Sequence, residues 1–209
     1  MRDTIDWSYK IVRNVIPDGY RSLLYDYFHN KRDIHKTMMN SGYISSKNKD
    51  FGCTGDGQPG VKQDTYSLYG DIMTEMLMSN LQPMMERETN MSLVPSYGYM
   101  RIYEKGDELK PHKDRPACEI STTMNIGGDF WPIFLRPDDY SNKSVKADLN
   151  PGDLLIYRGC DQLHWREPFK GNSATQVFLH YNDINGPYGM SNKFDKRPHL
   201  GLPGVFRKQ

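Results

Sequence analysis

Two histidines and one aspartate stand in a pattern that could bind a metal ion. His112 and Asp114 are two residues apart, so on an extended strand their side chains point to the same face. His164 follows a predicted buried strand at 153–157 and is the best candidate for a third ligand. Two imidazoles and one carboxylate leave positions of an octahedral ion open, which suits non-haem Fe(II) and oxygen chemistry, whereas zinc more often takes a closed tetrahedral set.

A His-x-Asp tripeptide alone is weak evidence for such a site, because a surface histidine beside a solvated aspartate gives the same pattern. The surrounding sequence favours the metal site. A tyrosine-bearing strand precedes the tripeptide, and a Pro-Gly-Asp turn at 151–153 leads into the strand before His164. We therefore expect His112, Asp114 and His164 to be the metal ligands and the catalytic centre.

Composition and charge limit the classes of protein. The chain has 209 residues, of which 27 are basic and 26 acidic, and its formal net charge is +1. A balance this even argues against a protein that coats nucleic acid or an anionic membrane. No apolar run approaches the length of a membrane span, and residues 1–9 are charged and polar, unlike a secretory leader. We expect a cytoplasmic protein with no membrane partner.

The three cysteines also indicate a reducing compartment. Cys53, Cys118 and Cys160 are an odd number at wide separations, which fits reduced thiols better than a disulfide framework. None of them has the spacing of a zinc-binding pair. Cys160 lies close before His164 and could be imagined as a ligand, although a half-buried thiol in a turn is the interpretation we prefer.

Helical patterns are confined to the first part of the chain. Apolar residues recur with helical spacing at 17–29 and at 66–88, and we expect both helices to pack on the rest of the domain. His29 and His35 are expected to be solvated residues near the end of the first helix. Residues 48–60 are rich in Gly, Asp and Lys, which predicts a mobile connection or, alternatively, a lid over a substrate.

Short strands dominate after residue 90. They are predicted at 93–103, 119–125, 130–135, 144–149, 154–157 and 175–181. Helices followed by regular short strands predict an α+β protein whose strands form a sandwich or a double-sheet jelly roll. We expect a single domain over 1–209, with helical support and a loop at 1–90, the jelly-roll core at 91–183 and a surface tail at 184–209.

One run of residues resembles a known family. Residues 101–114 read Arg-Ile-Tyr-Glu-Lys-Gly-Asp-Glu-Leu-Lys-Pro-His-Lys-Asp. This run resembles the Arg-x-Tyr-x-x-Gly…His-x-Asp segment of Fe(II)- and 2-oxoglutarate-dependent dioxygenases of the prolyl 4-hydroxylase type. The following strand, the Pro-Gly-Asp turn and the distal histidine fall in that family's order, and the resemblance covers about 93–183. It implies a double-stranded β-helix, which is a jelly roll, with His112, Asp114 and His164 as a facial triad on Fe(II).

The resemblance also implies the reaction. Fe(II) would bind 2-oxoglutarate at two positions and O2 at the last open one, and oxidative decarboxylation to succinate and CO2 would drive hydroxylation of a substrate. Asp114 favours hydroxylation, because related halogenases carry a small residue in place of this carboxylate. The implied substrate is a prolyl or other amino-acid side chain of a peptide or protein, or a free amino acid.

The residues that would bind 2-oxoglutarate follow the family only in part. Tyr103 matches the family tyrosine that hydrogen-bonds the far carboxylate, although it could be an ordinary strand tyrosine. Where relatives usually place a basic residue, about ten positions after the distal histidine, this chain has Ala174. Arg166 would lie on the same side as that histidine on an extended strand, and its guanidinium suits a carboxylate. We expect Arg166 to take this role. The alternatives are that Arg158 or Arg115 takes it, that Arg166 binds the substrate, or that the co-substrate differs.

The last predicted strand presents alternate residues to a cavity. By the family's register we expect these to be Gln176, Phe178 and His180, with Gln176 beside 2-oxoglutarate and His180 in contact with the substrate. His180 could instead be a hydrogen-bonded core histidine. Arg158 is a further candidate for contact with the substrate.

Two other functions are compatible with the same residues. Oxidative demethylation of an alkylated nucleic-acid base uses this fold, but it requires a nucleic-acid groove and usually a pair of arginines after the distal histidine. The even charge and Ala174 therefore disfavour nucleic acid as a partner. A non-catalytic jelly-roll protein with a structural metal is the other alternative, and iron content and succinate formation separate it from the enzymes. The sequence predicts neither the exact substrate nor the oligomeric state.

Overall fold

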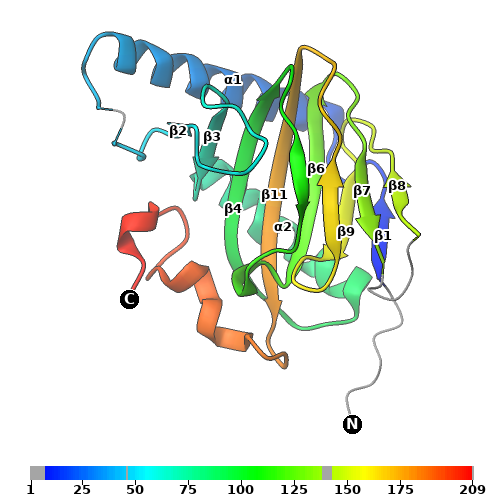
Figure 1. The fold of residues 1–209 in the computed structure, drawn as a ribbon. Coiled ribbons are helices and arrows are strands. Elements are labelled where there is room, and N and C mark those ends of the chain that lie inside the picture. Colours follow the sequence, from blue (N-terminus) through cyan, green and yellow to red (C-terminus); the bar gives the residue numbers. More distant parts are fainter. Residues whose placement is uncertain (1–7, 46, 138–142, 209) are drawn as a thin grey trace.

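The strands of this protein form two antiparallel sheets that face each other (Figure 1). The computed structural model describes residues 8–45, 47–137 and 143–208. Within these residues, the larger sheet has seven strands in the order β1-β9-β6-β11-β4-β3-β2, and the smaller has four in the order β5-β10-β7-β8. Strands that are distant in sequence are neighbours, as in a jelly roll. The predicted α+β jelly roll is confirmed.

All six strands predicted after residue 90 overlap an observed strand. The larger sheet contains β1 (Tyr9–Val12), β2 (Cys53–Thr54), β3 (Tyr66–Tyr69), β4 (Leu93–Glu104), β6 (Ile120–Gly128), β9 (Leu154–Arg158) and β11 (Ser173–Asp183). The smaller sheet contains β5 (Leu109–His112), β7 (Ile133–Arg136), β8 (Val145–Ala147) and β10 (Leu163–Arg166). Short 3-10 turns are η1 (Pro116–Cys118), η2 (Gly189–Lys196) and η3 (Gly204–Phe206). The six predicted strands do not include β1, β2 and β3, which lie at the two edges of the larger sheet, nor β5 and β10 of the smaller sheet.

Strands β4 and β11 form the centre of the larger sheet and divide the molecule into two sides. They pair antiparallel from Ser173 opposite Glu104 to Asp183 opposite Leu93. Because side chains alternate along a strand, Met100 and Ile102 point to one hydrophobic core, while the residues between them point to the other side of the sheet. That other side faces the smaller sheet and holds the cavity described below.

Two helices cover the outer face of the larger sheet (Figure 1). Helix α1 spans Asp18–Asn40 and helix α2 spans Ile72–Thr89. Their buried apolar side chains join the same core cluster as Met100 and Ile102, and they are Leu24, Phe28, Leu77, Met78 and Met85. Both predicted helices therefore pack on the sheet, as expected.

Helix α1 is longer than predicted. The apolar stripe ends near residue 29, whereas the helix continues to Asn40. His35 lies inside it and is buried, and the His29 ring nitrogen Nε2 is 3.0 Å from the Thr175 hydroxyl of β11. The expectation of a solvated side chain is therefore wrong for His35, whereas His29 is half-buried and contacts the sheet.

Helix α2 begins later than predicted. Residues 66–69 form β3 and pair with β4, with Tyr66 opposite Ile102. Gly70, with a φ of +67°, turns the chain away from the strand. The Asp71 carboxylate then accepts a hydrogen bond of 2.9 Å from the Met73 amide and caps the helix. The predicted helix at 66–88 is therefore too long at its start, because residues 66–69 pair with β4 instead.

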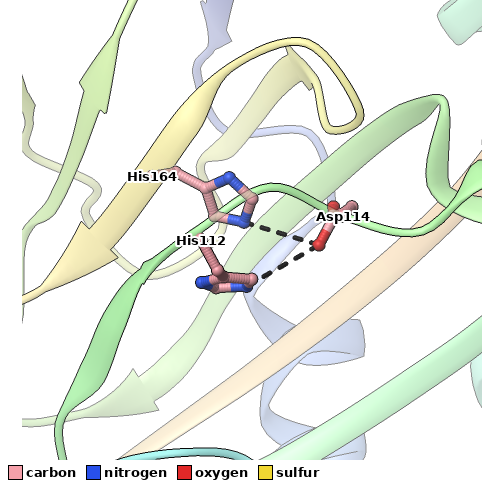
Figure 2. A group of neighbouring side chains, drawn as sticks. All are labelled: His112, Asp114 and His164. Atoms are coloured by element: carbon pink, nitrogen blue, oxygen red, sulfur yellow. Dashed lines mark ion pairs between the residues drawn. The ribbon is translucent and has the colours of Figure 1, made fainter.

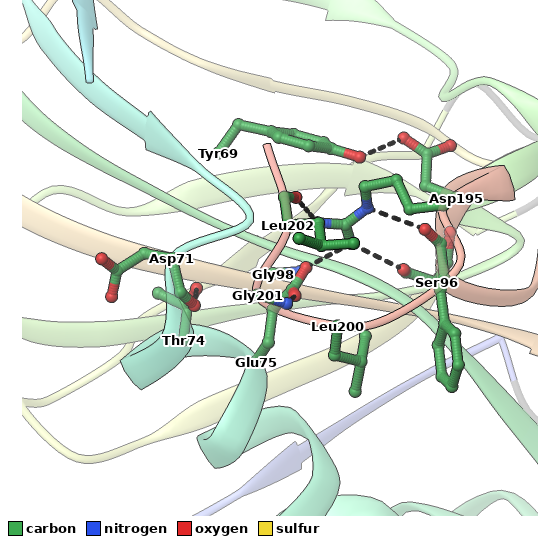
Figure 3. Close-up of polar contacts among 12 residues, drawn as sticks. Tyr69, Asp71, Thr74, Glu75, Ser96, Gly98, Asp195, Leu200, Gly201 and Leu202 are labelled. Atoms are coloured by element: carbon green, nitrogen blue, oxygen red, sulfur yellow. Dashed lines mark hydrogen bonds and ion pairs between the residues drawn. The ribbon is translucent and has the colours of Figure 1, made fainter. Parts of the chain in front are cut away.

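The C-terminal segment 184–209 has more contacts than the predicted surface tail would have. Among its described residues, Asn192, Asp195 and Arg197 are buried. Arg197 forms an ion pair of 2.5 Å with Glu75 of α2, and Glu75 also accepts a hydrogen bond from the Gly201 amide (Figure 3). Polar anchors therefore hold this segment against α2 and β4, which periodicity does not reveal.

No helix in the part of the chain that the structure describes is long and apolar enough to cross a membrane. Residues 1–7, which entered the expectation about a secretory leader, lie outside the described residues.

Candidate active site

The structure brings His112, Asp114 and His164 together between the two sheets (Figure 2). His112 ends β5 and is paired with His164 of β10, so the two imidazoles come from adjacent strands. The Asp114 Oδ1 atom lies 3.7 Å from His112 Nε2 and 3.5 Å from His164 Nε2. The three potential ligand atoms all lie within 4.8 Å of one another, which is compact enough for one metal ion.

Backbone contacts orient both imidazole rings. The Nδ1 atom of His112 is 2.8 Å from the Lys110 carbonyl, and Nδ1 of His164 is 3.0 Å from the Gln162 carbonyl. In the tautomer that donates a hydrogen bond from Nδ1 to the carbonyl, Nε2 is the nitrogen available to a metal ion, and in both residues Nε2 is the nitrogen closer to Asp114. Burial, followed by the neighbouring His164 ring, lowers the pKa of His112 below its ordinary value, which also favours the neutral form that binds metal.

Asp114 lies beyond the end of β5 and is held by other contacts. Its backbone amide donates to the Gly159 carbonyl at 2.8 Å, and its Oδ2 accepts from the Ser121 hydroxyl at 2.8 Å. A side chain at position 159 would clash with this carboxylate, so the close approach requires glycine. Burial alone would raise the pKa of Asp114, but the neighbouring His164 ring and the hydrogen bond from Ser121 hold it well below the ordinary value, and the carboxylate stays ionised.

A second group of potential ligands consists of Asp114, Cys118 and His180. It is a poorer metal site, because burial and the Asp114 charge raise the pKa of the Cys118 thiol well above its ordinary value. The thiol also exchanges a hydrogen bond of 3.1 Å with Tyr97. A protonated thiol in such a contact does not favour metal binding, so the histidine-aspartate-histidine group is the better candidate.

The expected ligands open onto a cavity of about 300 Å³. Its walls come from both sheets and include Tyr97, Tyr99, Arg101, Tyr103, Phe178 and His180. Of the three residues expected to face the cavity, Phe178 and His180 line it and Gln176 does not, whereas Val177 and Leu179 lie in the helix-side core. His180 also lies 3.0 Å from the Ser121 hydroxyl, through its Nδ1 atom, so it is both hydrogen-bonded and exposed to the cavity.

Arg166 lies deeper between the sheets and contacts only neutral groups among the described residues. It is 1% exposed, and it donates to the Trp131 carbonyl and, at 3.3 and 3.2 Å, to the Thr123 hydroxyl and the Gln176 amide oxygen. Its Nε atom is buried without a partner. Burial lowers the pKa of Arg166 to about 10, so the guanidinium is charged at neutral pH. A buried cation without a counter-ion is costly, which suits a site that receives an anion.

Tyr103 and Gln176 border the same region. Tyr103 is fully buried on β4, packs its ring edge-on to Trp131 at 4.8 Å and faces Ala174 of the neighbouring strand. Ala174 is fully buried and packs in one apolar cluster with Tyr103, Trp131 and Phe169. Gln176 is joined to Arg166 by the hydrogen bond of 3.2 Å, and neither residue is among the described residues that line the cavity.

The other two arginines considered from the sequence have different neighbours. Arg158 pairs with Asp161 at 2.6 Å and is not among the described residues that line the cavity, so the structure does not support its predicted contact with substrate. Arg115 does line the cavity, but both of its terminal nitrogens bind the Asp195 carboxylate, at 2.7 and 2.9 Å.

Several residues of the cavity were not singled out from the sequence. Arg101 and Tyr99 of β4 face it together with Asp56, which comes from the glycine-rich loop. Near the cavity mouth, Asp195 joins Arg115 to Tyr69 and Arg207. The alternation of residues 97, 99, 101 and 103 was a usable signal for the β4 residues. No local pattern marked Asp56 or Asp195, because their partners are distant in sequence.

Comparison with known proteins supports the fold. No protein-family model and no curated protein sequence matches the chain. A Pseudomonas putida prolyl-4-hydroxylase has a TM-score of 0.61 at 12% identity, over 86% of this chain and 96% of that one. HygX from Streptomyces hygroscopicus, solved with nickel and 2-oxoglutarate, has a TM-score of 0.60 at 10% identity, over 96% and 90%.

A third similar structure is a Trichoplax adhaerens prolyl hydroxylase in complex with a peptide fragment of the hypoxia-inducible factor oxygen degradation domain. It has a TM-score of 0.57 at 14% identity, over 84% of both chains. These likenesses show that the chain has the double-stranded β-helix fold of the 2-oxoglutarate- and Fe(II)-dependent oxygenases. They show the fold alone, and the chemistry is argued from the residues of this chain.

Proposed function

We propose that this protein is an Fe(II)- and 2-oxoglutarate-dependent hydroxylase. The observation that carries the proposal is a metal-binding group that lines a cavity, together with a buried arginine on the same strand as one of the expected ligands. Two imidazoles and a carboxylate converge in its lining, and Arg166, which is buried and has no carboxylate partner among the described residues, lies two residues after His164 on β10. A divalent metal fits the first group and the far carboxylate of a dicarboxylate fits the second.

The residues have separate roles in this proposal. His112, Asp114 and His164 would hold the iron, which, when bound together with 2-oxoglutarate, supplies the activation of O2 for hydroxylation. Arg166 receives the far carboxylate. Tyr103 contributes its phenol to the cavity wall beside Arg101, whose Nη1 atom lies 3.1 Å from the Tyr103 hydroxyl.

The substrate class is proposed as an amino-acid side chain, prolyl or other, in a peptide or protein or in a free amino acid. Two of the similar structures are prolyl hydroxylases, one of them in complex with a peptide. A second hollow of about 580 Å³ adjoins the cavity and shares Asp56, Tyr69, Tyr99 and Arg207 with it, so there is room for a substrate that extends beyond the metal centre. Demethylation of nucleic-acid bases has no comparable support in the described residues.

The proposal is tested by iron content and by succinate formation from 2-oxoglutarate. Purified protein reconstituted with Fe(II) should bind one iron and form succinate slowly even without substrate. Asp114→Ala should lose both properties and keep the folded far-ultraviolet circular dichroism spectrum. His199→Ala, a change at an exposed histidine, is the matched control. Wild-type protein that binds iron but forms no succinate would favour the non-catalytic alternative.

A further inference from the structure

Arg101 is a buried cation in the cavity wall whose charge is balanced by a residue from a loop. Its side chain is 6% exposed, and its Nη2 atom forms an ion pair with the Asp56 carboxylate. The same carboxylate oxygen accepts a hydrogen bond from the Tyr99 hydroxyl. Within the described residues, Asp56 is the only carboxylate that pairs with Arg101. The loop therefore inserts an anion into the cavity.

The loop around Asp56 is anchored on both sides of it, where the Phe51 carbonyl accepts a hydrogen bond of 2.9 Å from the Tyr66 hydroxyl and the Gly60 carbonyl accepts one of 2.9 Å from the Glu108 amide. Its glycines at 52, 55, 57 and 60 all have positive φ, and β2 contributes only two paired residues to the sheet. Among the described contacts of residues 55–59, the hydrogen bonds with β4 are all accepted by the Asp56 carboxylate, and Tyr99 and Arg101 donate them. Release of Asp56 would therefore free this part of the loop from the cavity wall.

Without Asp56, the cavity wall would present hydrogen-bond donors that lack an anionic acceptor. Arg101 Nη1 donates to the Tyr103 hydroxyl at 3.1 Å, and Nη2 donates to the Tyr99 hydroxyl at 3.2 Å. Its Nε atom is buried and has no partner even while Asp56 is in place. A desolvated guanidinium without an anion is unfavourable, so another carboxylate would be attracted to the same position.

We propose that Arg101 and Tyr99 form a subsite for a carboxylate of the substrate, and that Asp56 occupies this subsite until the substrate displaces it. The inference rests on the proposed function, since it specifies the substrate of the same cavity. Asp56 lines both the cavity and the outer hollow, which places the subsite at the mouth, on the substrate's path to the expected metal ligands. Arg166 is not among the lining residues and remains assigned to 2-oxoglutarate.

Two sources can supply the carboxylate. One is the α-carboxylate of a free amino acid or of a chain end, and the other is an acidic side chain within a peptide. N-acetylalanine compared with N-acetylalaninamide probes the first source. N-acetylglutamic acid α-amide compared with N-acetylglutamine α-amide probes the second. Each pair differs in one charge and has nearly the same shape.

Binding of these four probes is measured by NMR titration of the metal-free protein, which needs neither iron nor turnover. We expect one acid to bind and its amide not to. Asp56→Asn should bind that acid about tenfold more tightly, because the internal competitor has lost its charge. Asp64→Asn, at an exposed residue of the adjoining segment that pairs only with Lys62 among the described residues, should match the wild type.

Arg101→Gln should remove the preference for the acid, and Arg101→Lys should restore part of it. If Arg101→Gln does not fold, the double variant Asp56→Asn/Arg101→Gln, which leaves no buried charge of the pair, takes its place. The inference is overturned if Asp56→Asn binds the acids no more tightly than Asp64→Asn does, or if the acid preference survives loss of Arg101. Either result leaves the iron and succinate assays unaffected, so the two proposals fail separately.

Discussion

At the scale of single residues, Ser121 connects Asp114 to the larger sheet. Its hydroxyl donates to Asp114 Oδ2 at 2.8 Å and lies 3.0 Å from His180 Nδ1. We predict that Ser121→Ala weakens Fe(II) binding about tenfold, because the hydrogen bond from Ser121 fixes the orientation of Asp114, an expected metal ligand. Competition with a chelating dye measures the affinity. Ser41→Ala, at the exposed end of α1, should change nothing, and equal affinities for the two variants would show that Ser121 does not position Asp114.

Substitution of Arg166 should weaken the binding of 2-oxoglutarate with little effect on the stability of the fold. Arg166→Met should reduce the affinity for 2-oxoglutarate at least about 30-fold, since it removes charge-assisted hydrogen bonds worth roughly 2 kcal/mol or more. It should change the free energy of unfolding little, because the cost of unpaired acceptors on Trp131, Thr123 and Gln176 is offset by the loss of a buried cation that has no carboxylate partner among the described residues. Calorimetric titration and urea unfolding measure the two quantities.

Arg158→Met is the control for this change. Arg158 is not among the described residues that line the cavity, and it forms an ion pair with Asp161. It should leave the affinity for 2-oxoglutarate unchanged. A variant at position 166 that is strongly destabilised but binds 2-oxoglutarate normally would make Arg166 a structural residue.

The expected metal ligands could be predicted from sequence because their signal is local. His112 and Asp114 are close in the chain, and His164 follows a recognisable strand and turn. Arg166 could be considered for the same reason, through its spacing from His164. Asp56 and Asp195 could not, because their roles depend on partners that only the fold brings near.

At the scale of elements, a buried ion pair attaches the C-terminal segment to α2. The Arg197 and Glu75 side chains are 0% and 1% exposed and lie 2.5 Å apart. We predict that Arg197→Ala lowers the free energy of unfolding by about 3–5 kcal/mol, because it leaves Glu75 buried without its counter-ion. Urea unfolding followed by circular dichroism measures the change.

The matched control is Arg87→Ala, which breaks a pair with Glu88 on the surface of the same helix. Exposed pairs contribute about 0–1 kcal/mol, so this variant should unfold almost like the wild type. Similar losses in the two variants would mean that the C-terminal segment contributes little to the folded state.

Predictions of secondary structure failed where pairing or tertiary contacts overrode periodicity. Residues 66–69 continue the helical apolar pattern of α2, yet they pair with β4 and form β3. Helix α1 continues beyond its apolar stripe because His29 and His35 pack against the body of the protein. The strands after residue 90 were predictable since glycine, proline and asparagine mark their ends.

At the scale of the whole molecule, the apolar core and the cavity lie on opposite faces of the larger sheet of the jelly roll. Residues of β4 and β11 that face the helices form the apolar core, and the alternate residues of the same strands form the cavity wall. This division explains why the fold class was predictable from strand spacing and the resemblance together. The shape of the cavity was not, because the loop at 48–60 and the C-terminal segment complete it from outside the sheets.

The central claim is that one cavity holds both Fe(II) and 2-oxoglutarate, and it can be tested without knowing the substrate. Fe(II) and then 2-oxoglutarate are added to the protein without oxygen, and the visible spectrum is recorded. We predict a metal-to-ligand charge-transfer band that is absent in Asp114→Ala and needs much more 2-oxoglutarate in Arg166→Met. Protein that binds Fe(II) but shows no such band at saturating 2-oxoglutarate would contradict the claim.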